Sequence, residues 1–420
     1  MWHEHVRAGS IVPPSDLIEA GFYAYLAYAS LGSMVGFEVP LLGIGSLLVL
    51  ATLCTVRHGV RIDDLLRLVA LPLACALSLG AVQMLVHHQS LTSEYVKDIP
   101  AWILSLVILH SLCLRRGFLQ RFPLVMFLIG LAALGGLRST GWEIVTEAGD
   151  DVVRASGAGP LRNSNGMAFW FGFCFVYFVV IGLETRRLTV RLSSWTMALV
   201  CLGLVGITVS RGTLLAMAVA AIIALRRLLK RGFLPLLILL AGIWGVVLLG
   251  LFDTIAAFYT ARGLEETGRL SVWPLVIERI LSWPAWLHGV PVAEFGTWLP
   301  DSDRIVSPHN TFLFMGLAGG IVPFLLYAAY CQRAARGVWL GYRTNHPDAV
   351  FIAPFFVLVF LTAQATNFQV VEFPMIVTFA AALGMAHQPA RLQVSRRRGQ
   401  PQPAPLGRFR PVPSQSPLSR

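Results

Sequence analysis

The sequence predicts an all-α, polytopic membrane protein with about twelve transmembrane helices. Of its 420 residues, 56% are hydrophobic and only 13% are charged, which leaves too little polar surface for a soluble domain. Apolar stretches near the roughly 20 residues that cross a bilayer as a helix recur along the chain. Because backbone groups in hydrocarbon must be paired within their own segment, these stretches are predicted to be helices.

Twelve apolar stretches are the candidate transmembrane helices, and they make residues 1–390 one transmembrane domain. Several of them are short, so some helices must begin in the flanking loops or lie where the protein is locally thin. The predicted spans are Leu17–Met34, Val39–Val56, Leu65–Val86, Ala101–Leu114, Leu124–Leu137, Met167–Leu183, Ser193–Val209, Thr213–Leu225, Phe233–Phe252, Thr311–Tyr330, Val350–Thr366 and Val370–Met385.

The basic residues indicate the orientation in the membrane. The net charge is +11, and the positive residues, Arg121 among them, form short clusters between the apolar stretches. This is the pattern of cytoplasmic loops under the positive-inside rule, and it argues against a nucleic-acid partner. Both termini are therefore predicted to be cytoplasmic. The tail, residues 391–420, is rich in Pro, Arg, Gln and Ser and is predicted to be disordered and basic, a candidate for contact with anionic membrane lipid.

The six cysteines predict neither a disulfide framework nor a metal site. All of them lie in apolar stretches or at their ends, without metal-ligand spacing. The sequence also lacks a phosphate-binding glycine loop, a nucleophile elbow and a nucleotide fingerprint. No metal or cofactor is therefore expected, and the energy for a reaction on the outer side would have to arrive in an activated donor.

Two loops on the predicted outer side, 138–166 and 252–309, are much longer than the others, and long loops commonly carry function. Residues 268–281 of the second loop have apolar side chains at helical spacing. They predict a short amphipathic helix at the membrane interface, capped by Ser271 and with Pro274 in its first turn. Its predicted apolar face consists of Leu270, Trp273, Ile277, Ile280 and Leu281.

Two arginines on the outer side are candidate binding residues. Arg211 lies between two short apolar stretches, and a cation near membrane depth usually has a partner or a function. Arg269 stands immediately before the predicted amphipathic helix. Each has a plainer interpretation, because a loop arginine is commonly solvated or paired with a carboxylate. Two arginines facing one cavity would suit a pyrophosphate, since guanidinium groups bind phosphate oxygens in bidentate fashion.

His309 is the candidate general base. It follows Pro308 at the start of an apolar stretch, where Pro308 would preset the first turn and either Ser307 or Asn310 could cap the helix. The positive end of a helix disfavours imidazolium, so His309 is expected to be neutral and able to accept a proton. A histidine that only satisfies backbone groups is equally compatible with the pattern. His110, in contrast, lies within a predicted span and is expected to be packed.

The first long loop offers a second polar group just before the sixth predicted span. Its members are Arg154, Arg162, Asn163 and Asn165. Asparagine favours turns and helix caps, so a structural interpretation competes with ligand binding.

Taken together, these segments resemble the O-antigen ligase and O-antigen polymerase family of bacterial inner-membrane glycosyltransferases. The resemblance rests on Arg162-Asn-Ser-Asn-Gly-Met-Ala168, on Val209-Ser-Arg-Gly-Thr213, and on Gly268-Arg-Leu-Ser-Val-Trp273 followed by Pro308-His-Asn310. These motifs cover roughly residues 154–330, in the order and on the side of the membrane typical of the family. Each motif alone is weak.

The resemblance implies metal-independent, inverting transfer of a glycan from undecaprenyl pyrophosphate to an acceptor hydroxyl in the periplasm. It assigns the base to His309 and the donor pyrophosphate to Arg211 and Arg269, with Arg154, Arg162, Asn163, Asn165 and Asn310 as further candidate substrate-binding residues. Pro308 stands where relatives often have a small polar residue, which leaves the fine positioning of His309 open.

The preferred function is an O-antigen ligase that acts on a lipid A-core sugar. A polymerase or a protein O-oligosaccharyltransferase would use the same donor, and the sequence does not separate them. A twelve-helix transporter is the rival from another class. It is less favoured because the polar groups gather at one edge of the membrane and the two halves do not resemble each other. The sequence does not indicate an oligomeric state.

Overall fold

The computed structural model describes most of the predicted helical regions. It describes residues 17–32, 40–58, 62–90, 93–113, 115, 117–135, 143–147, 150–154, 161, 163–229, 269–295, 308–344, 346, 348–364 and 373–397. The predicted span Phe233–Phe252 and half of the loop 252–309 lie outside this part, as do residues 1–16 and Arg162. The statements below concern the described residues.

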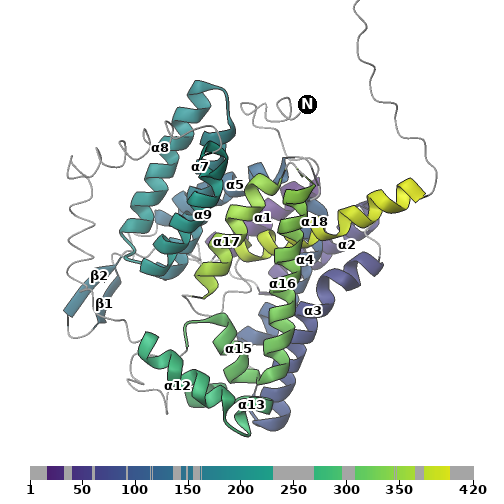
Figure 1. Ribbon diagram of the computed structural model, residues 1–420, viewed down its shortest axis with the longest axis vertical. Helices are drawn as coiled ribbons and strands as arrows, with labels where there is room; N and C mark the ends of the chain where they lie inside the picture. Colours follow the sequence, from purple (N-terminus) through teal and green to yellow (C-terminus); the bar gives the residue numbers. More distant parts are fainter. Residues whose placement is uncertain are drawn as a thin grey trace, which may run out of the picture. The chain divides into compact units, whose positions relative to one another are not determined.

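The first half of the chain is helical and ends in a short hairpin. Its elements are α1 (Leu17–Leu31), α2 (Pro40–His58), α3 (Ile62–Ala81) with the π-helical turn η3 (Val82–Val86), α4 (Ser93–Cys113), α5 (Phe118–Leu134), β1 (Glu143–Glu147) and β2 (Asp150–Arg154). The strands pair antiparallel, with Glu143 opposite Arg154 and Glu147 opposite Asp150 (Figure 1). The described part is otherwise helical, as predicted, and in this hairpin the first long loop forms cross-strand backbone hydrogen bonds of its own.

The second half carries the helices that surround the candidate site. They are α7 (Ser164–Glu184), α8 (Leu188–Gly206), α9 (Arg211–Leu229), α12 (Arg269–Leu281), α13 (Ala285–His288), the 3-10 turn η5 (Val292–Glu294), α15 (Thr311–Gly319), α16 (Ile321–Arg343), α17 (Ala349–Ala363) and α18 (Phe373–Arg397). α18 continues beyond Arg391, where the basic tail was expected to begin.

Several helices are apolar enough for a membrane-embedded protein. In the described part, three have both the length and the composition to cross a bilayer: Leu65–Val86, Ser164–Glu184 and Leu188–Gly206. Shorter apolar helices are Leu42–Arg57, Ile99–Cys113, Phe118–Leu134, Ala349–Ala363 and Phe373–Ala386. The total of twelve spans stays a prediction.

α7 is the central helix of the second half. It is buried along most of its length, as expected for a helix that is apolar on every side. Its glycines allow close packing, since a Cβ on Gly172 would meet Thr213 and Met217 of α9, and one on Gly182 would meet Trp195 of α8. α8 instead exposes leucines along one side, which suits a lipid-facing helix.

A buried ion pair joins α1 to α5. The Arg121 guanidinium donates two hydrogen bonds to the Glu19 carboxylate, at 2.6 and 2.7 Å, and the Tyr23 hydroxyl donates a third at 2.8 Å. Arg121 was expected in a cytoplasmic loop. It is buried instead, because Glu19 compensates its charge; removing either partner would leave a costly buried charge.

The predicted span Thr311–Tyr330 is two helices. α15 ends at Gly319 and α16 begins at Ile321, and Gly320 between them has a left-handed φ of 73°. Glycine adopts this conformation without the steric cost of a Cβ. α16 then extends to Arg343, so 23 residues follow the break. The break is visible in Figure 1, where the short α15 ribbon gives way to the long α16.

Candidate functional site

The amino-terminal ends of α7 and α9 are held together by polar side chains. Asn163 caps α7, because its side chain accepts a hydrogen bond from the Asn165 amide at 2.8 Å. Asn165 in turn accepts one from the Ser210 hydroxyl at 3.1 Å. Ser210 precedes Arg211, the first residue of α9, which is half-buried. The asparagine motif and the Ser-Arg-Gly motif therefore form one polar cluster.

Val209, at the base of this cluster, has an uncommon backbone. Its φ is +54°, in the left-handed region, and its side chain is fully buried. A β-branched residue in this conformation is a real outlier, since its Cβ lies too close to the following carbonyl oxygen. Strain of this kind persists only where the surroundings impose it, and it is common at functional sites.

His309 stands in a second strained turn, immediately before α15. Its φ is +48° and the residue is half-buried. Asn310 is the cap of α15, since its side chain accepts hydrogen bonds from the Phe312 and Leu313 amides at 3.0 and 3.1 Å. The cap is thus Asn310 and not Ser307, and Pro308 lies outside the helix. His309 consequently sits just before the amino-terminal end of α15.

α12 contacts this turn through Trp273. The indole Nε1 donates a hydrogen bond to the Pro308 carbonyl at 2.9 Å, so the residue preceding His309 is tied to the amphipathic helix. Trp273 was expected on the apolar face of the helix, with no partner predicted for its indole N–H. The indole N–H could have indicated a contact of this kind, because buried tryptophans usually find a hydrogen-bond acceptor.

The amphipathic helix itself differs from expectation in its start and its face. α12 begins at Arg269 and not after Ser271, and Pro274 lies inside it. Val272 and Val276 are its buried residues, whereas Ile277 and Leu281 are exposed. The buried stripe is therefore offset from the predicted one, and Ile277, Ile280 and Leu281 of the predicted face border a cavity that α15 also lines.

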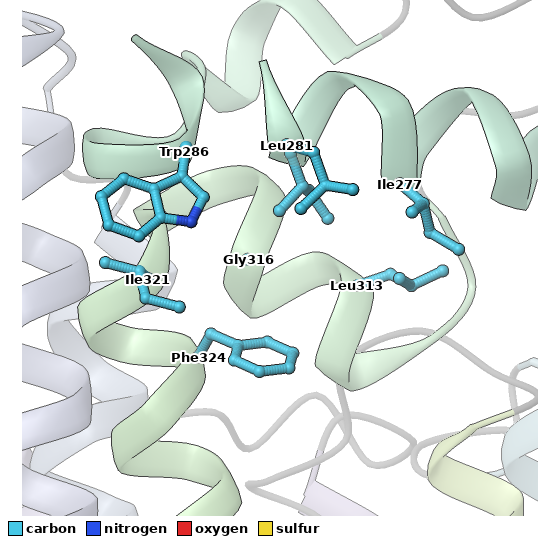
Figure 2. A pocket seen from close by; sticks show the side chains of 9 residues that line it. Ile277, Leu281, Trp286, Leu313, Gly316, Ile321 and Phe324 are labelled. Atoms are coloured by element: carbon cyan, nitrogen blue, oxygen red, sulfur yellow. The ribbon is translucent and has the colours of Figure 1, made fainter. Parts of the chain in front are cut away.

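That cavity is apolar and measures about 220 Å³. Residues from α12, the following α13, α15 and α16 line it. Figure 2 shows Leu281 and Trp286 on one side of it, facing Ile321 and Phe324 on the other. Since α12 and α15 both border it, the cavity adjoins the elements that position Trp273 and His309.

The start of α15 docks on the carboxyl end of α17. The Thr311 hydroxyl donates to the Ala363 carbonyl at 2.9 Å, and the Asn310 amide group donates to the Gln364 carbonyl at 3.3 Å. These two bonds use carbonyls that the end of a helix leaves without an intrahelical partner. Thr311 and Gln364 are further residues of the site that the sequence analysis missed, and no local pattern signals such a contact.

α17 links the two clusters, because it runs antiparallel to α7. Its Phe355 ring stacks on Phe173 at 4.2 Å between centroids, and Phe351 stacks on Tyr177 at 6.3 Å. Residue numbers in these contacts thus rise along α7, from Phe173 to Tyr177, and fall along α17, from Phe355 to Phe351. The start of α7 and the end of α17 therefore lie at the same end of the pair.

α9 packs against both α7 and α17. At its other end, the Arg226 guanidinium lies 3.8 Å from the centre of the Tyr342 ring, near the end of α16 and before α17 begins. The first residue of α9, Arg211, is consequently at the end where α17 finishes. Arg211, Asn165, Asn310 and His309 are brought to one end of these helices.

The remaining predicted site residues are placed only in part. Arg269 is the first residue of α12 and Arg154 the last of β2, but their side chains lie outside the described part, and Arg162 lies outside it altogether. His110 is buried in α4, as expected for a packed residue. Among the described residues, no cluster of three or more potential metal ligands occurs.

The comparisons with known proteins give the chain no family. No protein-family model matches it, and no curated protein matches it significantly.

Proposed function

We propose that the protein is a membrane glycosyltransferase of the O-antigen ligase type. It would transfer a glycan from undecaprenyl pyrophosphate to a sugar hydroxyl of lipid A-core at the periplasmic face of the inner membrane. The supporting observation is that the asparagine motif, the Ser-Arg-Gly turn and the His309 turn, far apart in sequence, meet at one end of α7, α9 and α17.

The proposed chemistry is a single in-line displacement. His309 takes the proton of the acceptor hydroxyl while that oxygen bonds to the anomeric carbon. The bond from this carbon to the pyrophosphate oxygen breaks, and the electron pair leaves with the pyrophosphate. Arg211 and Arg269 stabilise the charge that develops there. A single displacement inverts the anomeric carbon and needs no metal.

The apolar cavity also supports a lipid-linked donor. It is lined by Ile277, Leu281, Trp286 and neighbouring apolar residues, and it borders α12, which begins at Arg269. A prenyl chain could thus lie against apolar side chains while its pyrophosphate faces the arginines. Burial of each CH₂ group would contribute about 0.8 kcal/mol.

The decisive experiment measures glycan transfer by purified protein supplied with donor and acceptor. His309→Asn removes the imidazole but keeps a residue that tolerates a positive φ, so the turn should persist. We expect the rate to fall about 10²- to 10⁴-fold, the usual contribution of a general base. EDTA should have no effect. Transfer at the parental rate by His309→Asn would show that another group is the base.

His88→Asn is the matched control for the backbone. His88 also has a left-handed φ, of 52°, and its side chain is exposed. This variant should retain full activity. Likewise, Arg211→Gln should lower transfer strongly, whereas Arg191→Gln, an exposed arginine of α8, should not. Equal losses in a test variant and its control would indicate a general disturbance of the fold.

A deletion strain distinguishes the related functions. Loss of glycan-capped core together with accumulation of polymerised lipid-linked glycan supports a ligase. A single repeat unit on the core would indicate a polymerase, and loss of glycan from proteins would indicate a protein O-oligosaccharyltransferase. Loss of lipid-linked donor from the periplasmic face would instead favour a transporter.

A further inference from the structure

A group of basic side chains lies where α3 packs against α16, well away from the candidate site. The Cys75 thiol of α3 donates to the Pro323 carbonyl of α16 at 3.5 Å. A Cβ on Gly319, just before α16, would likewise meet Leu79, which follows Cys75 in α3. Arg67 precedes Cys75 and Arg333 follows Pro323. The two helices are therefore antiparallel, and Arg67 and Arg333 both lie about 12 to 15 Å along them from the Cys75 contact.

Arg336 lies one turn beyond Arg333 and enlarges the positive group. The first turn of α3 holds Asp63, which offsets part of this charge. The second half of α16 holds a further arginine, Arg343, and no carboxylate. The excess is positive, and guanidinium groups that repel one another gain from an anion placed between them.

A hollow of about 600 Å³ lies over Arg333 and Arg336. Its described lining comes from α16 alone and comprises Ala329, Gln332, Arg333, Ala335, Arg336 and Trp339. The Trp339 side chain is 53% exposed, and the Arg343 guanidinium lies 4.8 Å from its ring centre. Tryptophan and arginine together are typical of the layer where hydrocarbon meets lipid headgroups.

The position of Arg67 along α3 also agrees with the layer where hydrocarbon meets lipid headgroups. The apolar stretch of α3 long enough to cross the membrane begins at Leu65, two residues before Arg67. Between the hollow and its own amino-terminal end, α16 exposes Leu325 and Val322, about 12 and 16 Å from Arg333 along the helix. One leaflet of hydrocarbon is about 15 Å thick, so a single acyl chain would cover this exposed stripe.

We propose that this hollow binds the phosphate group of an anionic phospholipid from the cytoplasmic leaflet. Arg333 and Arg336 bind the phosphate oxygens, Trp339 packs beside the headgroup beyond the phosphate, and the acyl chains lie along Leu325 and Val322. A cluster of basic residues at the cytoplasmic end of a transmembrane helix is a known form of anionic lipid site. The proposal is independent of the glycosyltransferase assignment.

The test is lipid binding to the full-length protein purified in neutral detergent. Native mass spectrometry counts bound phosphatidylglycerol and gives its apparent dissociation constant, with phosphatidylcholine as the neutral comparison. The test variant is Arg333→Gln with Arg336→Gln. The control is Arg186→Gln with Arg187→Gln, two exposed arginines between α7 and α8 on the same predicted side, which gives the same charge change.

We expect saturable binding of phosphatidylglycerol that the test variant weakens about 25-fold, at roughly fivefold for each arginine, while the control changes it less than about twofold. If the double variant aggregates, Arg336→Gln alone, at an exposed position, should weaken binding about fivefold. Equal weakening by the control would show diffuse attraction and overturn the site. Equal binding of phosphatidylcholine would also overturn it, as would equal thermal stabilisation by inorganic phosphate alone.

Discussion

Val209 and His309 have left-handed backbones, and each stands immediately before a segment of the candidate site. A left-handed conformation costs a non-glycine residue about 1 to 2 kcal/mol, so the fold must hold both turns in place. Val209 is held by complete burial of its side chain. The His309 turn is held between the Asn310 cap and the hydrogen bond from Trp273 to Pro308. The imidazole position therefore depends on the indole of α12.

Trp273→Phe tests this dependence. It removes the indole N–H and keeps most of the ring volume, at a cost of about 1 kcal/mol for one hydrogen bond. We expect glycan transfer to fall several-fold while expression and melting temperature change little, because only the placement of His309 is affected. Transfer assays and thermal unfolding of purified protein measure both quantities.

Trp283→Phe is the matched control. Trp283 lies in the same segment but is 75% exposed, so its replacement should leave transfer unchanged. If Trp273→Phe behaves like this control, the bond to Pro308 does not position His309.

At the scale of elements, the junction of α15 and α16 interlocks with α13. Gly289 and Gly320 both have left-handed φ values, of 70° and 73°. A Cβ on Gly289 would overlap the Leu317 carbonyl, and one on Gly320 would overlap the Leu287 carbonyl. The Gln83 side chain of η3 fastens the same junction, because it donates to Val290 and Ala318 and accepts from the Val292 amide. This junction fixes the position of α15, which carries the His309 turn at its start.

Gly320→Ala should disrupt the junction. The added methyl group meets backbone atoms that cannot move aside, and alanine is strained at this φ. We expect a lower melting temperature, by at least several degrees, and a smaller monodisperse fraction in size-exclusion chromatography.

Gly203→Ala provides the comparison. Gly203 lies inside α8, and nothing stands within 4 Å of where its Cβ would be. Alanine is the better helix former by about 1 kcal/mol, so this variant should be neutral or slightly stabilised. Equal destabilisation by the two substitutions would mean that the junction is not tightly packed.

At the scale of the whole molecule, the predicted orientation places the candidate site outside the cytoplasm. The Arg226 and Tyr342 contact lies at the opposite end of α9 from Arg211, so the two ends should face different compartments. We expect a reporter fused after residue 300 to be active only in a non-cytoplasmic form and one fused after residue 346 only in a cytoplasmic form. The reverse pair of results would invert the topology and place His309 away from a periplasmic acceptor.

The sequence predicted the helices well where apolar length alone decides them. The span Leu65–Val86 coincides with the apolar stretch that the structure shows in α3 and η3, and Asn310 was one of two predicted caps for α15. The errors occurred where tertiary contacts compete with a local pattern. Arg121 became buried because Glu19 lies across from it, and the buried residues of α12 are Val272 and Val276 and not the larger apolar side chains at helical spacing.

The sequence by itself determined that the chain is membrane-embedded and which polar residues stand at helix ends, because hydrocarbon imposes length and composition on every span. Only the tertiary structure decided that these residues meet. The bonds from Ser210 to Asn165, from Trp273 to Pro308 and from Thr311 to Ala363 join residues 35 to 52 positions apart. Each depends on which helices pack together, and local patterns carry no information about that.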